Sequence, residues 1–265
     1  MPKKFDKPFF SIFIYNNPEK GYNVIIYDFM IKILSIVFPV FNEELRLKKT
    51  FEAIELFKKP DIFSDVEIIF VDDGSSDKTL ELIKNYKCSY PVFVKNYNKN
   101  RGKGFAVKTG MLASRGDYIL MLDVDMSTPF SEFKKFYSPI ENGCHIIIGS
   151  RKINGSSVIK YQPFFRELMG KCFTFLAKII TGNNISDFTC GFKCFSKKSA
   201  MEIFSKTKIE RWSYDAEILF LAKKFGFKIC EVGIAWENDE HTKVRLGIDT
   251  LQSFWDLIKI RLRKY

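Results

Sequence analysis

The sequence lacks any long apolar segment and has few histidines. Its 265 residues include two His, and the longest stretch without a charged residue, 8–18, spans 11 residues. A helix that crosses a bilayer needs roughly 20 apolar residues, so we expect no transmembrane helix. The P-loop spacing Gly-x-x-x-x-Gly-Lys-Ser/Thr is also missing, although residues 100–104 read Asn-Arg-Gly-Lys-Gly. These absences argue against a membrane-spanning protein and against a P-loop site.

The six cysteines form no Cys-x-x-Cys pair. They stand at positions 88, 144, 172, 190, 194 and 230, and neither His lies at metal-binding spacing from a pair of them. Cys190 and Cys194 are four residues apart, which does not indicate a zinc or redox site. We therefore expect buried free thiols in the reducing cytoplasm.

Acidic residues are fewer than basic ones, and the excess of positive charge is local. The chain has 42 Lys and Arg against 31 Asp and Glu, which makes the net charge +11. Residues 96–115 carry +5, residues 151–182 carry +5 and residues 243–265 carry +4, so the remainder carries −3. Such local charge predicts an anionic partner: nucleic acid, a phosphorylated substrate or an anionic membrane surface.

Apolar runs and helical patterns alternate along most of the chain. Hydrophobic residues make up 46% of the sequence, which is enough for one substantial core at this length. The alternation predicts a single α/β, Rossmann-like domain with a mostly parallel central sheet flanked by helices. Expected strands lie at 31–37, 66–71, 91–95, 118–122, 144–149, 191–195 and 228–235, and expected helices at 43–58, 79–86, 102–114, 163–181, 196–205 and 213–225.

The two ends of the chain fit this pattern poorly. Residues 1–29 are rich in Asn and precede Met30, a natural start, so we expect a disordered tail or a start-site artefact. A short membrane-touching segment is the alternative. We assign residues 30–245 to the α/β domain. In residues 246–265 apolar side chains recur every three to four positions beside Lys and Arg, which predicts an amphipathic basic helix. A helix that simply packs on the domain has the same pattern.

Acidic residues stand at the ends of three predicted strands, in the segments 43–44, 72–73 and 123–125. Open α/β sheets bind ligands at the carboxyl ends of their strands, where these carboxylates would repel one another without a cation. An Asp-x-Asp loop suits Mg²⁺ or Mn²⁺ that bridges a diphosphate. Each motif alone has a simpler explanation, because Asp-x-Asp is common on surfaces and residues 72–77 could be a solvated turn with a helix cap.

Together, the motifs and their spacing resemble the family 2 glycosyltransferases, which are inverting enzymes of the GT-A fold. The resemblance covers about residues 31–262. It rests on Phe-Pro-Val-Phe-Asn-Glu-Glu at 38–44, Glu-Ile-Ile-Phe-Val-Asp-Asp-Gly-Ser-Ser-Asp at 67–77, Asn-Arg-Gly-Lys-Gly-Phe-Ala-Val at 100–107, Gly-Asp-Tyr-Ile-Leu-Met-Leu-Asp-Val-Asp at 116–125 and Gly-Ser-Arg at 149–151. Segments 186–195, 210–219 and 258–265 look like the dolichyl-phosphate β-glucosyltransferase branch, near the polyprenyl-phosphate mannosyltransferases.

The resemblance implies a nucleotide-sugar site with a divalent cation, Mg²⁺ or Mn²⁺. Asp123 and Asp125 would hold the cation, and Arg211 and Lys243 would meet the acceptor phosphate. A cation and basic side chains would stabilise the charge that develops on the leaving diphosphate. The implied nucleotide-sugar-binding residues are Pro39, Phe41, Glu43, Val71, Asp73, Lys103, Asp123, Val124, Ser127 and Arg151.

Two later aspartates are candidate catalytic residues. The acceptor in this branch is a lipid phosphate that is already ionised at neutral pH, so a strong base is less necessary than for a sugar hydroxyl. Asp187 is the first candidate for a base or for a residue that positions the acceptor, and Asp215 is the second. The simpler alternatives are a turn cap at Asp187 and an acid in the first turn of a helix at Asp215.

The expected function is transfer of a single sugar to a polyprenyl or dolichyl phosphate with inversion, with UDP-glucose as the favoured donor. Because membrane segments typical of relatives are missing, membrane contact would be peripheral, on the cytoplasmic face, through the C-terminal helix. A GDP-mannose donor, a non-lipid acceptor and a non-catalytic nucleotide-sugar-binding module are alternatives. A nucleic-acid-binding protein fits the net charge, but the chain shows no RNA-module or zinc-finger pattern, so we expect no nucleic acid partner.

Overall fold

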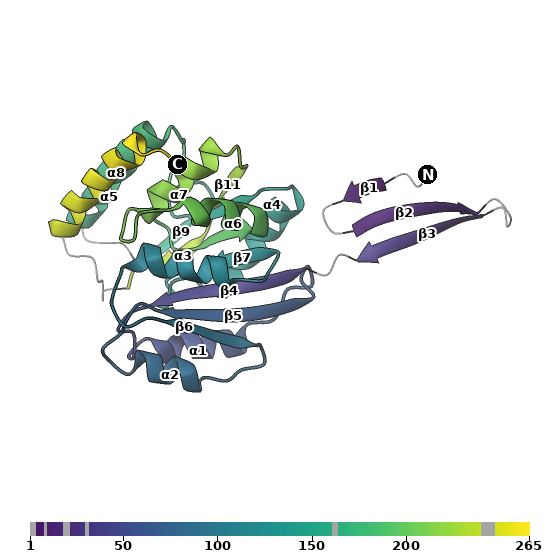
Figure 1. Ribbon diagram of the computed structural model, residues 1–265, viewed down its shortest axis with the longest axis horizontal. Coiled ribbons are helices and arrows are strands. Elements are labelled where there is room, and N and C mark those ends of the chain that lie inside the picture. Colours follow the sequence, from purple (N-terminus) through teal and green to yellow (C-terminus); the bar gives the residue numbers. More distant parts are fainter. Residues whose placement is uncertain (1–3, 8–9, 18–21, 30–31, 161–163, 240–246) are drawn as a thin grey trace.

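A seven-stranded sheet forms the centre of the computed structural model, with helices on both of its faces (Figure 1). The structure describes residues 4–7, 10–17, 22–29, 32–160, 164–239 and 247–265. The strand order is β11-β8-β10-β7-β4-β5-β6. These strands are β4 (Ile33–Val40), β5 (Asp65–Asp72), β6 (Val92–Asn96), β7 (Tyr118–Met121), β8 (Ile146–Ser150), β10 (Lys193–Ser196) and β11 (Ile229–Gly233).

The prediction of a mostly parallel sheet is confirmed. β4 pairs in parallel with β5 and β7, β5 with β6, and β8 with β11, whereas β10 runs antiparallel to both of its neighbours. Strands β4 and β5 are buried on both faces, for example at Ile36 on one face and Val37 on the other. This burial explains why they stand out in the sequence as continuous apolar runs rather than alternating ones.

Two hydrophobic cores lie on the two faces of the sheet. One face is covered by α3 (Lys103–Ala113), α5 (Phe164–Thr181), α6 (Lys197–Lys206), α7 (Tyr214–Lys224) and α8 (Ile248–Leu262). The other is covered by α1 (Leu47–Leu56), α2 (Thr79–Asn85), the 3-10 helix η1 (Phe130–Phe136) and α4 (Tyr137–Glu141). A small parallel pair joins β9 (Ser157–Lys160) and β12 (Ala235–Glu237).

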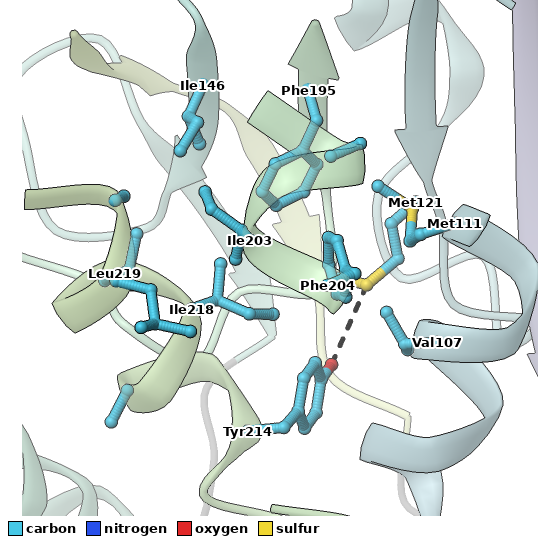
Figure 2. Packing of buried hydrophobic residues seen from close by; sticks show 14 of the residues in the cluster. Val107, Met111, Met121, Ile146, Phe195, Ile203, Phe204, Tyr214, Ile218 and Leu219 are labelled. Carbon is cyan, nitrogen blue, oxygen red and sulfur yellow. Dashed lines mark hydrogen bonds between the residues drawn. The ribbon is translucent and has the colours of Figure 1, made fainter. Parts of the chain in front are cut away.

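Figure 2 shows the first of these cores, between α3, α6 and α7. The aromatic rings of Phe195 and Phe204 pack edge to face with centroids 5.4 Å apart. The buried hydroxyl of Tyr214 donates to the Sδ of Met121 at 3.8 Å. None of the described helices combines the length and the hydropathy that a membrane span requires.

The amino-terminal segment forms three strands where we expect a tail without regular structure. β1 (Lys4–Lys7), β2 (Phe10–Asn17) and β3 (Tyr22–Phe29) make an antiparallel sheet separate from the central one. The reason is local, since both longer strands are rich in β-branched and aromatic residues. The expectation of an unstructured tail is therefore corrected for these ranges, and the division of the chain at residues 29 and 245 stays a prediction.

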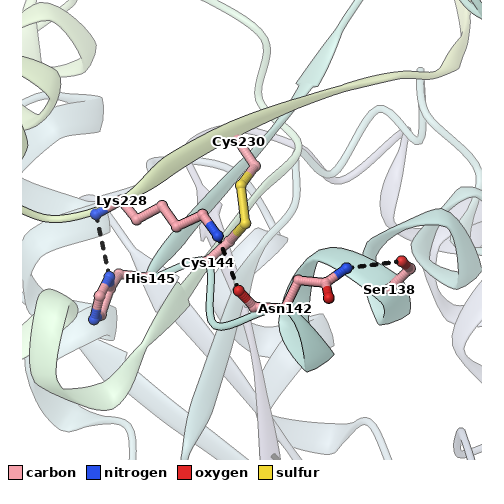
Figure 3. The surroundings of a disulfide bond; sticks show 6 residues. All are labelled: Ser138, Asn142, Cys144, His145, Lys228 and Cys230. Atoms are coloured by element: carbon pink, nitrogen blue, oxygen red, sulfur yellow. Dashed lines mark hydrogen bonds between the residues drawn. A yellow bond between two sulfur atoms is a disulfide. The ribbon is translucent and has the colours of Figure 1, made fainter.

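One pair of cysteines is joined, which corrects the expectation of free thiols. Cys144 and Cys230 form a disulfide with a Cα–Cα distance of 6.2 Å (Figure 3). Cys144 precedes β8 and Cys230 lies in β11, and these strands are neighbours although the residues are 86 positions apart. Spacing in the sequence therefore gives no sign of the pairing. The other four cysteines are free.

Candidate active site

Three neighbouring parallel strands end at one edge of the sheet, and predicted site residues follow each of them. β7, β4 and β5 are adjacent, so their carboxyl ends lie side by side. Residues 123–125 follow β7, residues 41–43 follow β4, and Asp73 follows β5. Open α/β sheets bind their ligands at this edge.

The carboxylate of Asp73 holds the loop that leads into α3. It is buried, and it accepts hydrogen bonds from the backbone N–H of Arg101 at 2.9 Å, the backbone N–H of Gly102 at 2.8 Å and the amide of Asn100 at 2.8 Å. Gly102 has a φ of +112°, and a Cβ there would lie 2.6 Å from the carbonyl oxygen of Glu210. The Asn-Arg-Gly-Lys-Gly motif is therefore a loop clamped beside the end of β5.

Contacts from α1 fix the backbone of the Asp-x-Asp loop. The hydroxyl of Thr50 donates to the carbonyl oxygen of Val124 at 2.6 Å, and Nζ of Lys49 donates to that of Asp125 at 3.1 Å. The Asp125 carboxylate accepts the backbone N–H of Ser127 at 2.8 Å. Burial raises the pKa of Asp125, and the neighbouring Asp123 carboxylate raises it further. Two carboxylates held this way attract a cation.

Lys103 supplies positive charge beside these carboxylates. Its Nζ lies 2.6 Å from Oδ1 of Asp123, and the two side chains are 24% and 30% exposed. Burial lowers the pKa of Lys103, but the carboxylates of Asp123, Asp215 and Asp125 outweigh burial and raise that pKa above its ordinary value. Gly191 leaves room for the pair, because a Cβ there would stand 2.0 Å from Oδ2 of Asp123.

The donor set suits a divalent cation that also binds the phosphate oxygens of a ligand. Asp123 and Asp125 offer carboxylate oxygens on one loop, and Mg²⁺ usually binds one or two carboxylates and completes its shell with phosphate and water. Within the described ranges there is no cluster of three or more potential metal ligands. The residues therefore fit a cation shared with a diphosphate rather than one held by protein alone.

Arg151 and Asp187 form a closed pair after β8. Nε and Nη2 of Arg151 lie 2.6 and 2.7 Å from the two oxygens of Asp187, which is completely buried, and the backbone N–H of Arg151 donates to the same carboxylate at 3.1 Å. Burial opposes ionisation of Asp187, but Arg151 outweighs burial and lowers the pKa of Asp187 to about 2. A general base must be accessible and have a pKa near the working pH. The geometry therefore favours a positioning role for Asp187.

Asp215 lies in the first turn of α7 and is also buried. One of its oxygens is 2.5 Å from Nζ of Lys193, a completely buried side chain that also donates to the carbonyl oxygen of Cys190. Burial raises the pKa of Asp215, against the attraction of Lys193 and Lys103. Lys193 is not among the predicted site residues, although a lysine between apolar residues in a short strand signals a buried partner.

Two of the predicted contact residues turn their side chains into the cores. Val71 and Val124 are buried apolar side chains, so any contact with a ligand would involve their backbone. Pro39 pairs in register with Val71 between β4 and β5. Phe41 and Ser127 are half-buried at the edge of the sheet.

The remaining predicted residues differ in how far they are engaged. The carboxylate of Glu43 lies 2.6 Å from Nε of Arg46, and its backbone N–H donates to the hydroxyl of Thr79 at 2.7 Å. Arg211 is exposed and lines a cleft of about 510 Å³ beside Lys208. The prediction for Lys243 lies outside the described residues.

Comparison with solved structures defines the class of the fold as GT-A. Glucosyl-3-phosphoglycerate synthase from Mycobacterium tuberculosis in complex with UDP matches with a TM-score of 0.63 at 16% identity, over 88% of this chain and 82% of that one. The same enzyme with Mn²⁺, UDP and glucosyl-3-phosphoglycerate matches with a TM-score of 0.65 at 16% identity, over 88% and 81%. The predicted fold class is confirmed.

Comparison of sequences identifies the family. The glycosyl transferase family 2 model matches residues 35–204. The dolichyl-phosphate β-glucosyltransferase of Dictyostelium discoideum is 35% identical over 242 residues, 87% of this chain and 74% of that protein. The Homo sapiens enzyme of the same name is 36% identical over 251 residues, 90% and 78% of the two chains. The chain belongs to glycosyltransferase family 2, as the sequence motifs predict.

Proposed function

We propose that this chain transfers one glucose from UDP-glucose to a dolichyl or polyprenyl phosphate, with inversion at the anomeric carbon. The observation that carries the proposal is the cluster of Lys103, Asp123 and Asp125 at the carboxyl edge of the sheet. Two further facts support it: relatives 35–36% identical bear the name of this reaction, and a solved enzyme of the same fold was determined with UDP.

The nucleotide is assigned to the end of β4 and β5. Its base and ribose would lie against Pro39, Phe41 and Glu43. The loop that Asp73 clamps forms the neighbouring wall, because its backbone N–H groups are tied down by the buried carboxylate. A wall that is ordered before the ligand arrives loses little conformational freedom on binding, which favours affinity.

Lys103 and the Asp-x-Asp loop are assigned to the diphosphate. A divalent cation, Mg²⁺ or Mn²⁺, at Asp123 and Asp125 would supply positive charge where the leaving UDP gains negative charge. Lys103 adds a second positive charge, because its raised pKa keeps the ammonium group protonated at neutral pH. Because the pair with Asp123 is partly open, Lys103 can exchange that carboxylate for a phosphate oxygen. Charge placed this way stabilises the transition state more than the ground state.

The acceptor needs orientation more than a base. A phosphate is already ionised at neutral pH, so its oxygen can attack the anomeric carbon without giving up a proton. Asp187 is assigned to holding Arg151 in place, and Asp215 to holding Lys193 and supporting the charge of Lys103. Arg211 is assigned to the acceptor phosphate, together with Lys243.

The proposed location is the cytoplasmic face of a membrane, with peripheral contact through α8. The support is the exposed apolar stripe of α8 and the dolichyl phosphate that the names of the similar enzymes contain. In a reducing compartment the Cys144–Cys230 disulfide would open. The two hydrophobic cores, the ladder of the central sheet and the buried ion pairs would remain to hold the domain together.

The proposal is tested by a transfer assay with a short, water-soluble polyprenyl phosphate as acceptor. UDP-glucose, GDP-mannose and UDP-GlcNAc are compared in Mg²⁺, Mn²⁺ and chelator. We expect transfer from UDP-glucose alone, lost in chelator, with a β-linked product by NMR. Transfer from GDP-mannose instead would show that this nucleotide sugar, and not UDP-glucose, is the donor. No transfer from any donor would contradict the proposal.

Asp125→Asn tests the metal assignment within the same assay. Loss of one carboxylate should lower kcat by at least about 100-fold, the size of effect seen when one transition-state-stabilising group is removed. Asp61→Asn, an exposed aspartate before β5, is the matched control and should keep full activity. Equal activity of the two variants would show that Asp125 does not bind the metal.

A further inference from the structure

Exposed apolar side chains are concentrated on two helices. Among the described residues, 14 large apolar side chains are exposed, and eight of them lie on α5 and α8. Phe175 and Ile179 are each 64% exposed, and Trp255 is 59% exposed. These eight residues, called here the α5–α8 face, are Leu168, Phe175, Leu176, Ile179, Leu251, Trp255, Ile258 and Leu262.

Both helices carry their exposed apolar residues on one stripe. In α8 the stripe runs through positions 251, 255, 258 and 262, and in α5 the same spacing runs through 168, 172, 175 and 179, where 172 is the exposed Cys172. Residues at i, i+4, i+7 and i+11 lie on one side of an α-helix. Each helix thus has an outward apolar stripe where a surface helix normally has polar residues.

A second stripe on each helix already packs on the domain. Ala177 of α5 and Leu257 and Ile260 of α8 are completely buried. The helices also touch each other, with the rings of Phe173 and Phe254 6.5 Å apart, and Figure 1 shows them side by side at the border of the domain. The outward stripes are therefore surplus to the fold and lie on adjacent helices.

Basic residues border these stripes. Lys171 and Lys178 lie on α5, and Lys259 and Arg261 lie on α8, within the basic segments 151–182 and 243–265. Part of this charge is matched within each helix, because Lys171 pairs with Glu167 and Lys259 with Asp256. The core of a protein–protein interface is depleted of lysine. An apolar stripe bordered by Lys and Arg instead matches the boundary between the acyl chains and the headgroups of an anionic bilayer.

The α5–α8 face also adjoins the candidate active site. The hydroxyl of Ser213, two residues before Asp215, donates to the carbonyl oxygen of Ser253 in α8 at 3.2 Å. The basic cleft that contains Arg211 is also lined by Lys259 of α8 and by Arg263, the residue that follows this helix. A lipid whose tail lies in a bilayer beneath these helices would have its phosphate next to the basic cleft.

We propose that α5 and α8 together form the surface that docks this protein on an anionic bilayer, with α5 as an equal partner of α8. The proposal deepens the function proposed above and rests on it only for the lipid nature of the acceptor. It differs in its prediction for α5, because a protein anchored by α8 alone would not respond to changes in α5.

The test is flotation of the full chain with phosphatidylcholine vesicles that contain or lack phosphatidylserine. We expect binding to the anionic vesicles. The double change Phe175→Ser and Ile179→Ser should lower the partition coefficient by at least about tenfold. Burying either apolar side chain in the bilayer is expected to contribute at least the free energy that corresponds to a tenfold change in binding. The matched control is Leu56→Ser with Leu82→Ser, two exposed leucines on α1 and α2, and it should not change binding.

Variants that remove positive charge test whether the α5–α8 face binds an anionic bilayer. Lys171→Gln and Lys178→Gln should each weaken binding to anionic vesicles by about fivefold and leave binding to neutral vesicles unchanged. If the α5 double variant floats like the wild type while Trp255→Ser with Ile258→Ser does not, the proposal fails for α5. If the wild type forms a stable dimer by sedimentation, binds no vesicles, and becomes monomeric in the α5 variant, the face is a protein interface and the proposal is overturned.

Transfer to the water-soluble acceptor separates this proposal from the proposed function. The α5 variant should keep wild-type kcat with that acceptor, which also shows that it is folded. Loss of vesicle binding with intact transfer supports the docking surface. Absence of transfer in the wild type, whatever its vesicle binding, counts against the proposed function alone.

Discussion

Two ion pairs flank β10 in the sheet, and they are built in opposite ways. Lys103 and Asp123 make one short contact, and 24% and 30% of their side chains are exposed. Arg151 and Asp187 make two short contacts, and their exposed fractions are 15% and 0%. Both pairs join a basic residue to an aspartate that sequence motifs single out, so residue type does not distinguish them.

The difference in burial separates two roles. A partly open pair can exchange its partner when a phosphate or a cation arrives, because solvent and ligand can take over each charge. A buried pair cannot, since removing one partner leaves a buried charge without compensation. We therefore assign the chemistry to Lys103 and Asp123, and the support of the site to Arg151 and Asp187.

The largest expected effect breaks the closed pair. Asp187→Asn leaves the largely buried guanidinium of Arg151 without its carboxylate, so we expect the free energy of unfolding to fall by about 3–5 kcal/mol. Urea unfolding followed by circular dichroism measures this change. Asp65→Asn, on the exposed start of β5, is the control. A loss below about 1 kcal/mol would place Asp187 among the reactive groups instead.

The next effect addresses the open pair. Lys103→Met should lower kcat by about 100-fold, because a positive charge beside the leaving group is lost. It should change the free energy of unfolding by no more than about 1 kcal/mol, as expected for a partly exposed pair. Lys48→Met, on the exposed face of α1, should keep both values. If Lys103→Met unfolds the protein as Asp187→Asn does, the two pairs are equivalent and the comparison fails.

A smaller effect is the response of the closed pair to acid. The pKa of Asp187 is about 2 in the folded protein, below the ordinary value of about 3.9 in an unfolded chain. Ionised Asp187 therefore stabilises the folded protein by about 2–3 kcal/mol. This stabilisation is present above about pH 4, the pKa in the unfolded chain, and is lost as the pH falls through the folded pKa. The measurement is the difference in unfolding free energy between wild type and Asp187→Asn at several pH values. A difference that stays constant down to pH 2 would contradict the assigned pKa.

Much of the fold could be predicted because its signals are local. The buried parallel strands appear as continuous apolar runs, such as the one that becomes β5, and their order along the chain follows. The Asp-x-Asp loop and the Asn-Arg-Gly-Lys-Gly loop could be placed at strand ends for the same reason. The predicted tail was wrong in residues 4–7, 10–17 and 22–29, where β-branched and aromatic residues form strands despite the surrounding Asn and Pro.

The partners of the site residues could not be predicted. Arg151 meets Asp187 across 36 positions, Lys193 meets Asp215 across 22, and Cys144 meets Cys230 across 86. Val71 and Asp73 belong to one motif, yet the first side chain enters the core and the second clamps a loop. Whether a side chain at the end of a strand enters the core or meets a loop depends on the segments that pack against that strand.

The family, the α/β architecture and the set of acidic and basic residues at the strand ends could all be inferred from the amino-acid order. This is possible because periodicity and motif spacing are properties of neighbouring residues. The folded chain was needed to show which aspartate is sealed against Arg151 and which stays open beside Lys103. It was also needed to show that the outward apolar residues of α5 and α8 lie on adjacent helices. Burial and pairing are set by contacts between distant segments, and these exist only once the sheet and its helices are assembled.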